Sequence, residues 1–197
     1  MKPHVLTGLI VTVGLTTIMA QPSLQASPAI SGNQPSLSSA NEAEAYNDRG
    51  VELAEQGKLA QAIAAFNQAI KISPKFENAH NNLGLALGSQ NKFSEAAAAF
   101  KRALAINPKN FETYNNLGIA LGSQGKLREA VAAFNQAIQI NPNDPTSRQN
   151  LGVAFWSQGK LPEAVAFLQK AKELYSVQNN TEGINHVEEI LQEIKVH

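Results

Sequence analysis

The pattern of hydrophobic and polar residues repeats along the chain with a shift of 34 residues. Residues 80–110 and 114–144 align without a gap and are identical at 19 of 31 positions. The string EAAAAF at 95–100 returns as EAVAAF at 129–134, and related strings precede and follow them. A period of this length predicts an array of stacked repeats, because no single repeat could bury its apolar face alone.

Each repeat is predicted to contain two helices separated by a tight turn. The first position of the turn is always Gly or Asn, the residues that most readily adopt the left-handed conformation that ends a helix; the turns are Gly57-Lys58, Asn91-Lys92, Gly125-Lys126 and Gly159-Lys160. The second helix should end before a proline, because the residue preceding proline is disfavoured in a helix; these prolines are Pro74, Pro108 and Pro142. Pro162 instead falls at the opening of the last second helix, where a missing N–H is harmless.

These features together resemble the tetratricopeptide repeat family, whose units combine an aromatic residue, a following Leu-Gly pair, an Ala-x3-Phe string and a late proline. We divide the chain into four repeats: 43–76, 77–110, 111–144 and 145–178. The third repeat carries every feature: Tyr114, Leu117, Gly118, Leu121, Ala130, Phe134, Ala137 and Pro142. The other repeats depart from the pattern at Arg49, His80, Arg148, Leu168 and Ser176. The resemblance implies an all-α, right-handed α-solenoid of helix-turn-helix repeats.

Family geometry also assigns roles in packing. A small residue on each first helix should face the second helix closely; these are Gly50, Gly84, Gly118 and Gly152. The large residues Phe66, Phe100 and Phe134 are expected to bury against the following repeat.

Residues 179–197 are predicted to form a capping helix. Between Thr181 and Val196, one face carries Ile184, Val187, Ile190, Leu191 and Ile194 at helical spacing. Asn180 or Thr181 can cap its start. A stacked array needs such an element to cover its last apolar surface. The alternative is a dimerisation helix.

The N-terminal residues have the pattern of a targeting segment. Lys2 precedes sixteen uncharged, mostly apolar residues, which is typical of a secretory signal peptide over residues 1–20. Cleavage would follow Ala20 or Ala26. An uncleaved membrane anchor and a buried core helix are the alternatives. Residues 21–42, rich in Pro and Ser, are predicted to be a flexible spacer.

The composition argues against several classes of function. The sixteen basic and sixteen acidic residues balance, which argues against a nucleic-acid-binding protein. The absence of cysteine excludes thiol catalysis and cysteine-ligated zinc. We find no nucleophile elbow, phosphate-binding glycine loop or zinc-protease helix, and therefore predict no enzyme activity, no cofactor and no metal site.

The resemblance implies that the first helices line a ligand-binding groove. Its expected polar contacts are amides, which suit the backbone of an extended peptide because they both donate and accept hydrogen bonds; the candidates are Asn47, Asn81, Asn82, Asn115, Asn116, Gln149 and Asn150, with Trp156 closing the floor. An aliphatic row of Val51, Leu85, Ile119 and Val153 lies beside them, followed by a row of Ala54, Gly88, Gly122 and Trp156 and then by Glu55, Ser89, Ser123 and Ser157. Alternatively, the amides cap neighbouring helices or bond to one another.

The sequence therefore predicts an exported, non-catalytic scaffold or assembly module that binds a protein or peptide partner in its groove. Its location would be periplasmic, luminal or secreted, or membrane-tethered if the N-terminal segment is not cleaved. The alternative function is a repeat protein that self-associates, for example as a homodimer, without a groove ligand.

Overall fold

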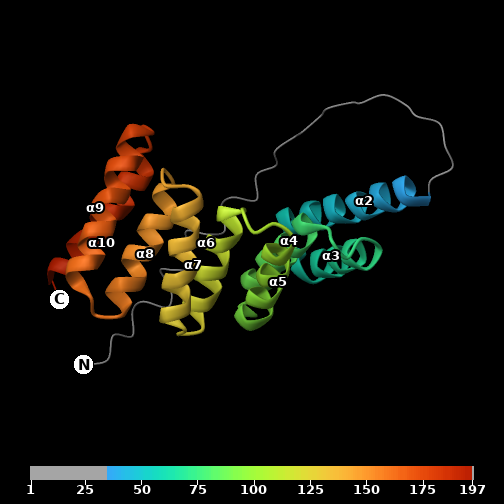
Figure 1. Ribbon diagram of the computed structural model, residues 1–197, viewed down its shortest axis with the longest axis horizontal. Helices are drawn as coiled ribbons and strands as arrows, with labels where there is room; N and C mark the ends of the chain where they lie inside the picture. Colours follow the sequence, from blue (N-terminus) through green and yellow to red (C-terminus); the bar gives the residue numbers. More distant parts are fainter. Residues whose placement is uncertain (1–34, 197) are drawn as a thin grey trace. The chain divides into compact units, whose positions relative to one another are not determined.

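The computed structural model describes residues 35–196, and the described part consists of nine helices and their connections (Figure 1). The predicted signal peptide and the first part of the spacer lie outside these residues. The chain divides into two compact bodies, with the boundary between residues 106 and 107. We call the described helices before it the N-terminal body and those after it the C-terminal body, and describe each by itself.

The N-terminal body holds the first two repeats. Its helices are α2 (Pro35–Glu55), α3 (Leu59–Ile72), α4 (Glu77–Ser89) and α5 (Phe93–Ile106). Each helix packs on the next one along the chain, and α2 also packs on α4. This is the order expected of consecutive helical hairpins.

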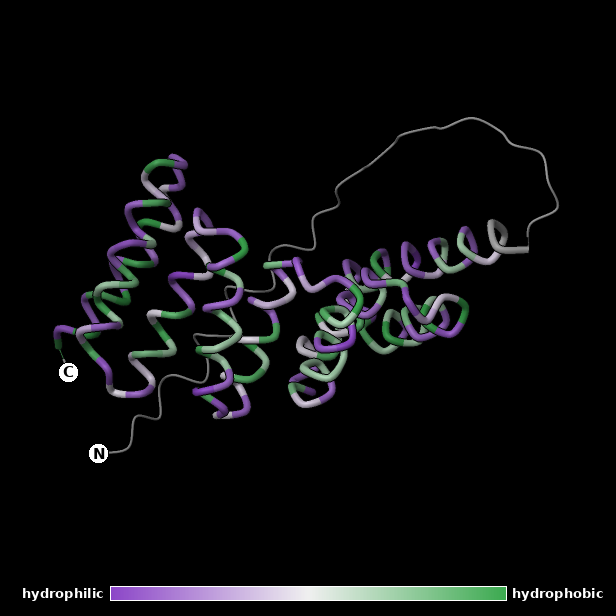
Figure 2. The backbone as a smooth tube through the Cα atoms, in the orientation of Figure 1, coloured by the Kyte–Doolittle hydropathy of each residue, from purple (hydrophilic) through white to green (hydrophobic). Residues whose placement is uncertain are grey.

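The C-terminal body holds the last two repeats and one further helix. Its helices are α6 (Phe111–Ser123), α7 (Leu127–Ile140), α8 (Pro145–Ser157), α9 (Leu161–Val177) and α10 (Thr181–Val196). Again each helix packs on the next, and α6 also packs on α8. In Figure 2, hydrophobic and hydrophilic segments alternate along the helices of both bodies, as amphipathic helices require.

The turns inside the repeats have the conformation that the sequence predicts. The φ angles of the residues that end the first helices are positive: 72° at Gly57, 60° at Asn91, and 75° at both Gly125 and Gly159. The second helices α3, α5 and α7 end two residues before Pro74, Pro108 and Pro142. Pro162 lies in the first turn of α9. The positions of helix ends are therefore local consequences of Gly, Asn and Pro.

The start of α2 differs from the prediction. The helix begins at Pro35, so residues 35–42, which we expected in the flexible spacer, are helical. Proline is well tolerated in the first turn of a helix, and none of the following residues to 42 is Gly or Pro. The turn of α2 anchored by the buried Ala43 and Asn47 can therefore extend toward the N-terminus.

Aromatic rings pack on glycines within each repeat. Phe66, Phe100 and Phe134 are buried as predicted. We expected them against the following repeat. Phe66 does line one hollow with Leu85 and Ala86 of that repeat, and each ring also lies directly over the glycine of its own repeat. A Cβ atom placed at Gly84 would come within 2.5 Å of the Phe100 ring, and one at Gly118 would come equally close to Phe134. The missing Cβ therefore creates the space that the ring fills.

The last helix covers the apolar end of the C-terminal body. Val187, Ile190 and Ile194 of α10 are buried in one cluster with Leu168 and Tyr175. The side chain of Asn180 accepts a 2.8 Å hydrogen bond from the backbone N–H of Gly183, which confirms the predicted cap. The resemblance to a capped solenoid is thus confirmed for this end of the chain.

Tyr175 joins α9 to its neighbours. Its ring lies over Gly183, and its hydroxyl is 3.2 Å from that of Thr146. Burial raises the pKa of Tyr175 above 10.0, the hydrogen bond to Thr146 lowers it in part, and the negative charge of Asp144 raises it further. The hydroxyl therefore stays protonated at neutral pH and can donate a hydrogen bond.

Candidate peptide-binding surfaces

Two pairs of amides link the first helices of consecutive repeats. In the N-terminal body, the amide nitrogen of Asn82 on α4 donates to the side-chain oxygen of Asn47 on α2, at 2.9 Å. In the C-terminal body, Asn150 on α8 donates in the same way to Asn115 on α6, at 3.1 Å. Donor and acceptor are 35 residues apart in both pairs. The recurrence shows that these asparagines hold adjacent repeats in register.

This pairing divides the predicted ligand contacts into two groups. Asn47, Asn115, Gln149 and Asn150 are buried, with at most 8% of their surface exposed. The half-buried residues are Asn81, Asn82, Asn116 and Trp156. The structure thus has the alternative arrangement, in which amides bond to one another, at four of these residues: Asn47, Asn82, Asn115 and Asn150. A partner could reach only the second group without rearrangement of the helices.

Gln149 occupies the same repeat position as the acceptors Asn47 and Asn115. It is 2% exposed, and its side-chain oxygen has no hydrogen-bond partner among the described residues. In the two pairs, the donor comes from the first helix of the following repeat. For Gln149, the helix in the place of the next first helix is α10, which lacks the repeat pattern. Gln149 is thus the acceptor at the end of the series, without a donor.

We expect Gln149→Met to raise the free energy of unfolding by about 1 kcal/mol, because a buried polar group without a partner costs roughly 1–3 kcal/mol. Asn115→Ala should instead lower it by about 1–3 kcal/mol, since it leaves the amide of Asn150 unpaired. Urea denaturation followed by circular dichroism measures both. A loss of stability in Gln149→Met would contradict the assignment of an unsatisfied oxygen.

A small hollow lies between α2, α3 and α4 in the N-terminal body. It has a volume of about 10 Å³ and is lined by Val51, Ala54, Leu59, Phe66, Asn82, Leu85, Ala86 and Ser89. Val51, Leu85, Ala54, Ser89 and Asn82 belong to the rows expected along the groove. Leu59, Phe66 and Ala86 were not predicted there, because the first two lie on the second helix, α3, and Ala86 lies on the buried side of α4. The hollow is about one water probe in size and therefore suits a small side-chain group.

Open space also lies over Gly88 on α4, which does not line the hollow. A Cβ atom placed there would meet nothing within 4 Å. The equivalent position in the fourth repeat is Trp156, which is half-buried and packs against the cluster that contains Val153. Ser89 and Ser157 each donate to a carbonyl oxygen four residues earlier in their own helix, at 3.0 and 2.9 Å. Their hydroxyls thus already have acceptors, and the accessible chemistry of these faces is mainly apolar.

Two classes of site are not found in residues 35–196. No group of three or more His, Asp or Glu residues there could hold a metal ion. None of the described helices is both long enough and apolar enough to cross a bilayer.

Comparison with known proteins identifies the repeats. A family model described as "TPR repeat" matches residues 50–91, and one described as "Tetratricopeptide repeat" matches residues 81–145 and 115–179. No curated protein sequence matches the chain.

Solved structures share the fold. A crystal structure of MamA has 26% sequence identity and a TM-score of 0.67, covering 71% of this chain and 81% of that one. MamA from Desulfovibrio magneticus RS-1 has 23% identity and a TM-score of 0.66, covering 70% and 78%. The first TPR of Spaghetti (RPAP3), solved with an HSP90 peptide, has 22% identity and a TM-score of 0.60, covering 61% and 95%. On the four in-phase repeats, their helical hairpins and the family models, the chain belongs to the tetratricopeptide repeat family.

Proposed function

We propose that this protein is a non-catalytic protein-interaction scaffold that binds an extended polypeptide segment along the first helices of its repeats. The observation that carries the proposal is the apolar hollow between α2 and α4, with Asn82 at its edge. The structure of the Spaghetti (RPAP3) repeat domain, which is bound to an HSP90 peptide, supports a peptide as the class of ligand.

The chemistry of the hollow suits a peptide with small apolar side chains. Val51, Ala54 and Leu85 offer apolar surface, and burial of apolar area contributes about 25 cal/mol per Å². The amide nitrogen of Asn82 is already used for Asn47, and its side-chain oxygen is an acceptor. That oxygen can accept a hydrogen bond from a backbone N–H of the ligand. The side chain would then bridge the repeat contact and the peptide.

A peptide library measured by fluorescence polarisation tests this proposal. Gly88→Trp should fill the open space on α4 and weaken binding by about tenfold, which corresponds to about 1.4 kcal/mol. The matched control is Ala98→Trp, which places the same side chain on the exposed side of α5 in the same repeat. Equal affinities of the two variants would exclude the α2–α4 surface as the binding site.

Single amide substitutions show which of the two bodies binds a given ligand. Asn82→Ala should weaken a ligand of the N-terminal body, and Asn116→Ala a ligand of the C-terminal body. If neither changes the affinity of any library peptide, the half-buried amides do not contact the ligand.

We also propose export, on the sequence of residues 1–20 alone. N-terminal sequencing of the protein isolated from its own cells should find a first residue after Ala20 or Ala26. A chain that still begins at Met1 would contradict cleavage.

A further inference from the structure

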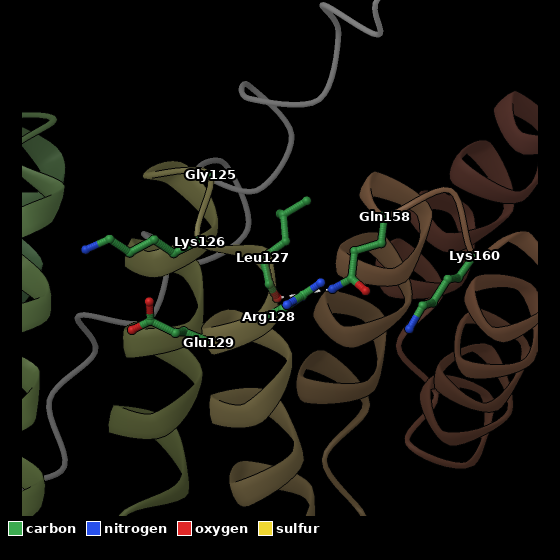
Figure 3. A pocket seen from close by; sticks show the side chains of 7 residues that line it. All are labelled: Gly125, Lys126, Leu127, Arg128, Glu129, Gln158 and Lys160. Atoms are coloured by element: carbon green, nitrogen blue, oxygen red, sulfur yellow. Dashed lines mark hydrogen bonds between the residues drawn. The ribbon is translucent and has the colours of Figure 1, made fainter.

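A second hollow lies at the turn end of the C-terminal body, away from the first-helix residues discussed above. It has a volume of about 580 Å³ and lies where the turn between α6 and α7 meets the turn between α8 and α9 (Figure 3). Pockets for small molecules and short peptide segments typically measure about 300–1,000 Å³. This hollow is therefore large enough for several side chains of a partner.

Its lining carries an excess of positive charge. Lys126, Arg128 and Lys160 line it, against the single carboxylate of Glu129. Within the described residues, the ion pairs lie elsewhere and hold none of the three cations. Within the lining, Glu129 thus offsets only one of the three positive charges.

The side chains are arranged so that two cations flank one polar group. In Figure 3, Arg128 and Lys160 lie on either side of Gln158, whereas Lys126 and Glu129 lie together on the far side of Leu127. The amide nitrogen of Gln158 donates to the carbonyl oxygen of Leu127 at 3.2 Å, which ties the end of α8 to the start of α7. The side chain of Gln158, which lies between the two cations, is therefore held by a contact between repeats.

The side chain of Lys160 is also restrained. Its ammonium group lies over the ring of Phe155, 5.5 Å from the centroid, and that ring stacks on Phe167 at 5.5 Å. A cation over an aromatic face keeps its charge available while its side chain loses freedom. Less conformational entropy is then lost when an anion binds.

We propose that this hollow, formed by Arg128, Gln158 and Lys160 with Lys126 at its margin, binds an anionic side chain of a partner polypeptide. A guanidinium group binds carboxylate and phosphate oxygens bidentately, and the neighbouring ammonium adds a second charge. The ligand is therefore a glutamate, an aspartate or a phosphorylated residue in an extended segment. A polynucleotide is disfavoured, because Glu129 lines the same hollow and α10 carries four glutamates in the same body, Glu182, Glu188, Glu189 and Glu193.

This site is independent of the proposed function, since it uses turn residues and no residue of the first-helix surface between α2 and α4. Loss of one binding activity would leave the other unchanged. The two surfaces could engage different segments of one partner, or two partners.

Fluorescence polarisation on the full chain, with three labelled peptides of equal length, tests the proposal. One peptide carries spaced Glu residues, one phosphoserine at the same positions, and one Gln. At low salt, the Glu or phosphoserine peptide should bind at least about fivefold more tightly than the Gln peptide, and salt should weaken binding because the charges are exposed to solvent. The better of the two anionic peptides identifies the source of the charge.

Variants locate the site. Arg128→Glu and Lys160→Glu should each weaken the anionic peptide by roughly tenfold, and Arg128→Gln should weaken it less. The matched control is Lys109→Glu, an exposed residue of the same body that does not line the hollow. Circular dichroism verifies that each variant folds. Three results would overturn the proposal. One is equal binding of the Glu, phosphoserine and Gln peptides, and another is an effect of Lys109→Glu as large as that of Arg128→Glu. The third is tighter binding of a single-stranded oligonucleotide at the same residues.

Discussion

Replacing Phe134 with alanine is expected to lower the free energy of unfolding of the C-terminal body by about 3–5 kcal/mol. The ring is 1% exposed and fills the space over Gly118, where no Cβ competes for it. Its removal loses the apolar burial of a whole aromatic side chain and leaves a cavity, because α6 and α7 can collapse only in part. Urea denaturation, followed by circular dichroism, gives the change.

The matched control for Phe134 is Phe167→Ala in the same body. Phe167 is half-buried and stacks on Phe155 with ring centroids 5.5 Å apart. Phe167→Ala should therefore lower the free energy of unfolding by less than Phe134→Ala, because part of the Phe167 side chain is already in water in the folded state. A loss in Phe134→Ala no larger than that in Phe167→Ala would show that the buried rings do not form the core of the repeats.

Gly84→Ala is expected to lower the free energy of unfolding of the N-terminal body by about 1–3 kcal/mol, the usual range for overpacking. The added Cβ would come within 2.5 Å of the Phe100 ring. That ring is 3% exposed and is confined by its neighbours, so α4 and α5 must move apart to admit the methyl group. Chemical denaturation of the purified variant measures the loss.

The same helix supplies a control with the opposite sign. Gly88→Ala adds a Cβ to open space, so only the higher helix propensity of alanine remains, and stability should rise by about 0.5–1 kcal/mol. The two substitutions differ by one turn of α4 and by the presence of a ring. If both change stability in the same direction, close packing against Phe100 is not the reason for glycine at position 84.

Most of the fold could be predicted because its signals are local and recur. The 34-residue period, the Gly or Asn at each turn and the prolines after the second helices place nearly every helix end. The exceptions have local reasons as well. Helix α9 has 17 residues where α7 has 14, because Ser176 stands where the other repeats have proline and the helix continues to Val177.

The candidate site could be predicted only in part. The repeat positions predicted that Val51, Leu85 and Asn82 lie on neighbouring first helices, and the structure brings these three residues to one hollow. They could not show which amides pair, because the pairing depends on how closely two helices approach and on which side-chain rotamers face each other. Glycine at position 84 likewise gave no indication of which ring covers it. Asn115 and Gln149 share one repeat position, yet only Asn115 has a donor, because α10, which takes the place of the next first helix after Gln149, no longer follows the repeat.

The 35-residue spacing of the asparagine pairs has a consequence for how such a chain can lengthen. The donor stands one place after the acceptor in the repeat, so a repeat with Asn at both places holds one acceptor and one donor of this kind. A tandem duplication of the coding segment for residues 111–144 would insert Asn115 and Asn116 together and supply both halves of a new contact. The gene could thus gain a repeat in one event, with the contact to its neighbours already encoded.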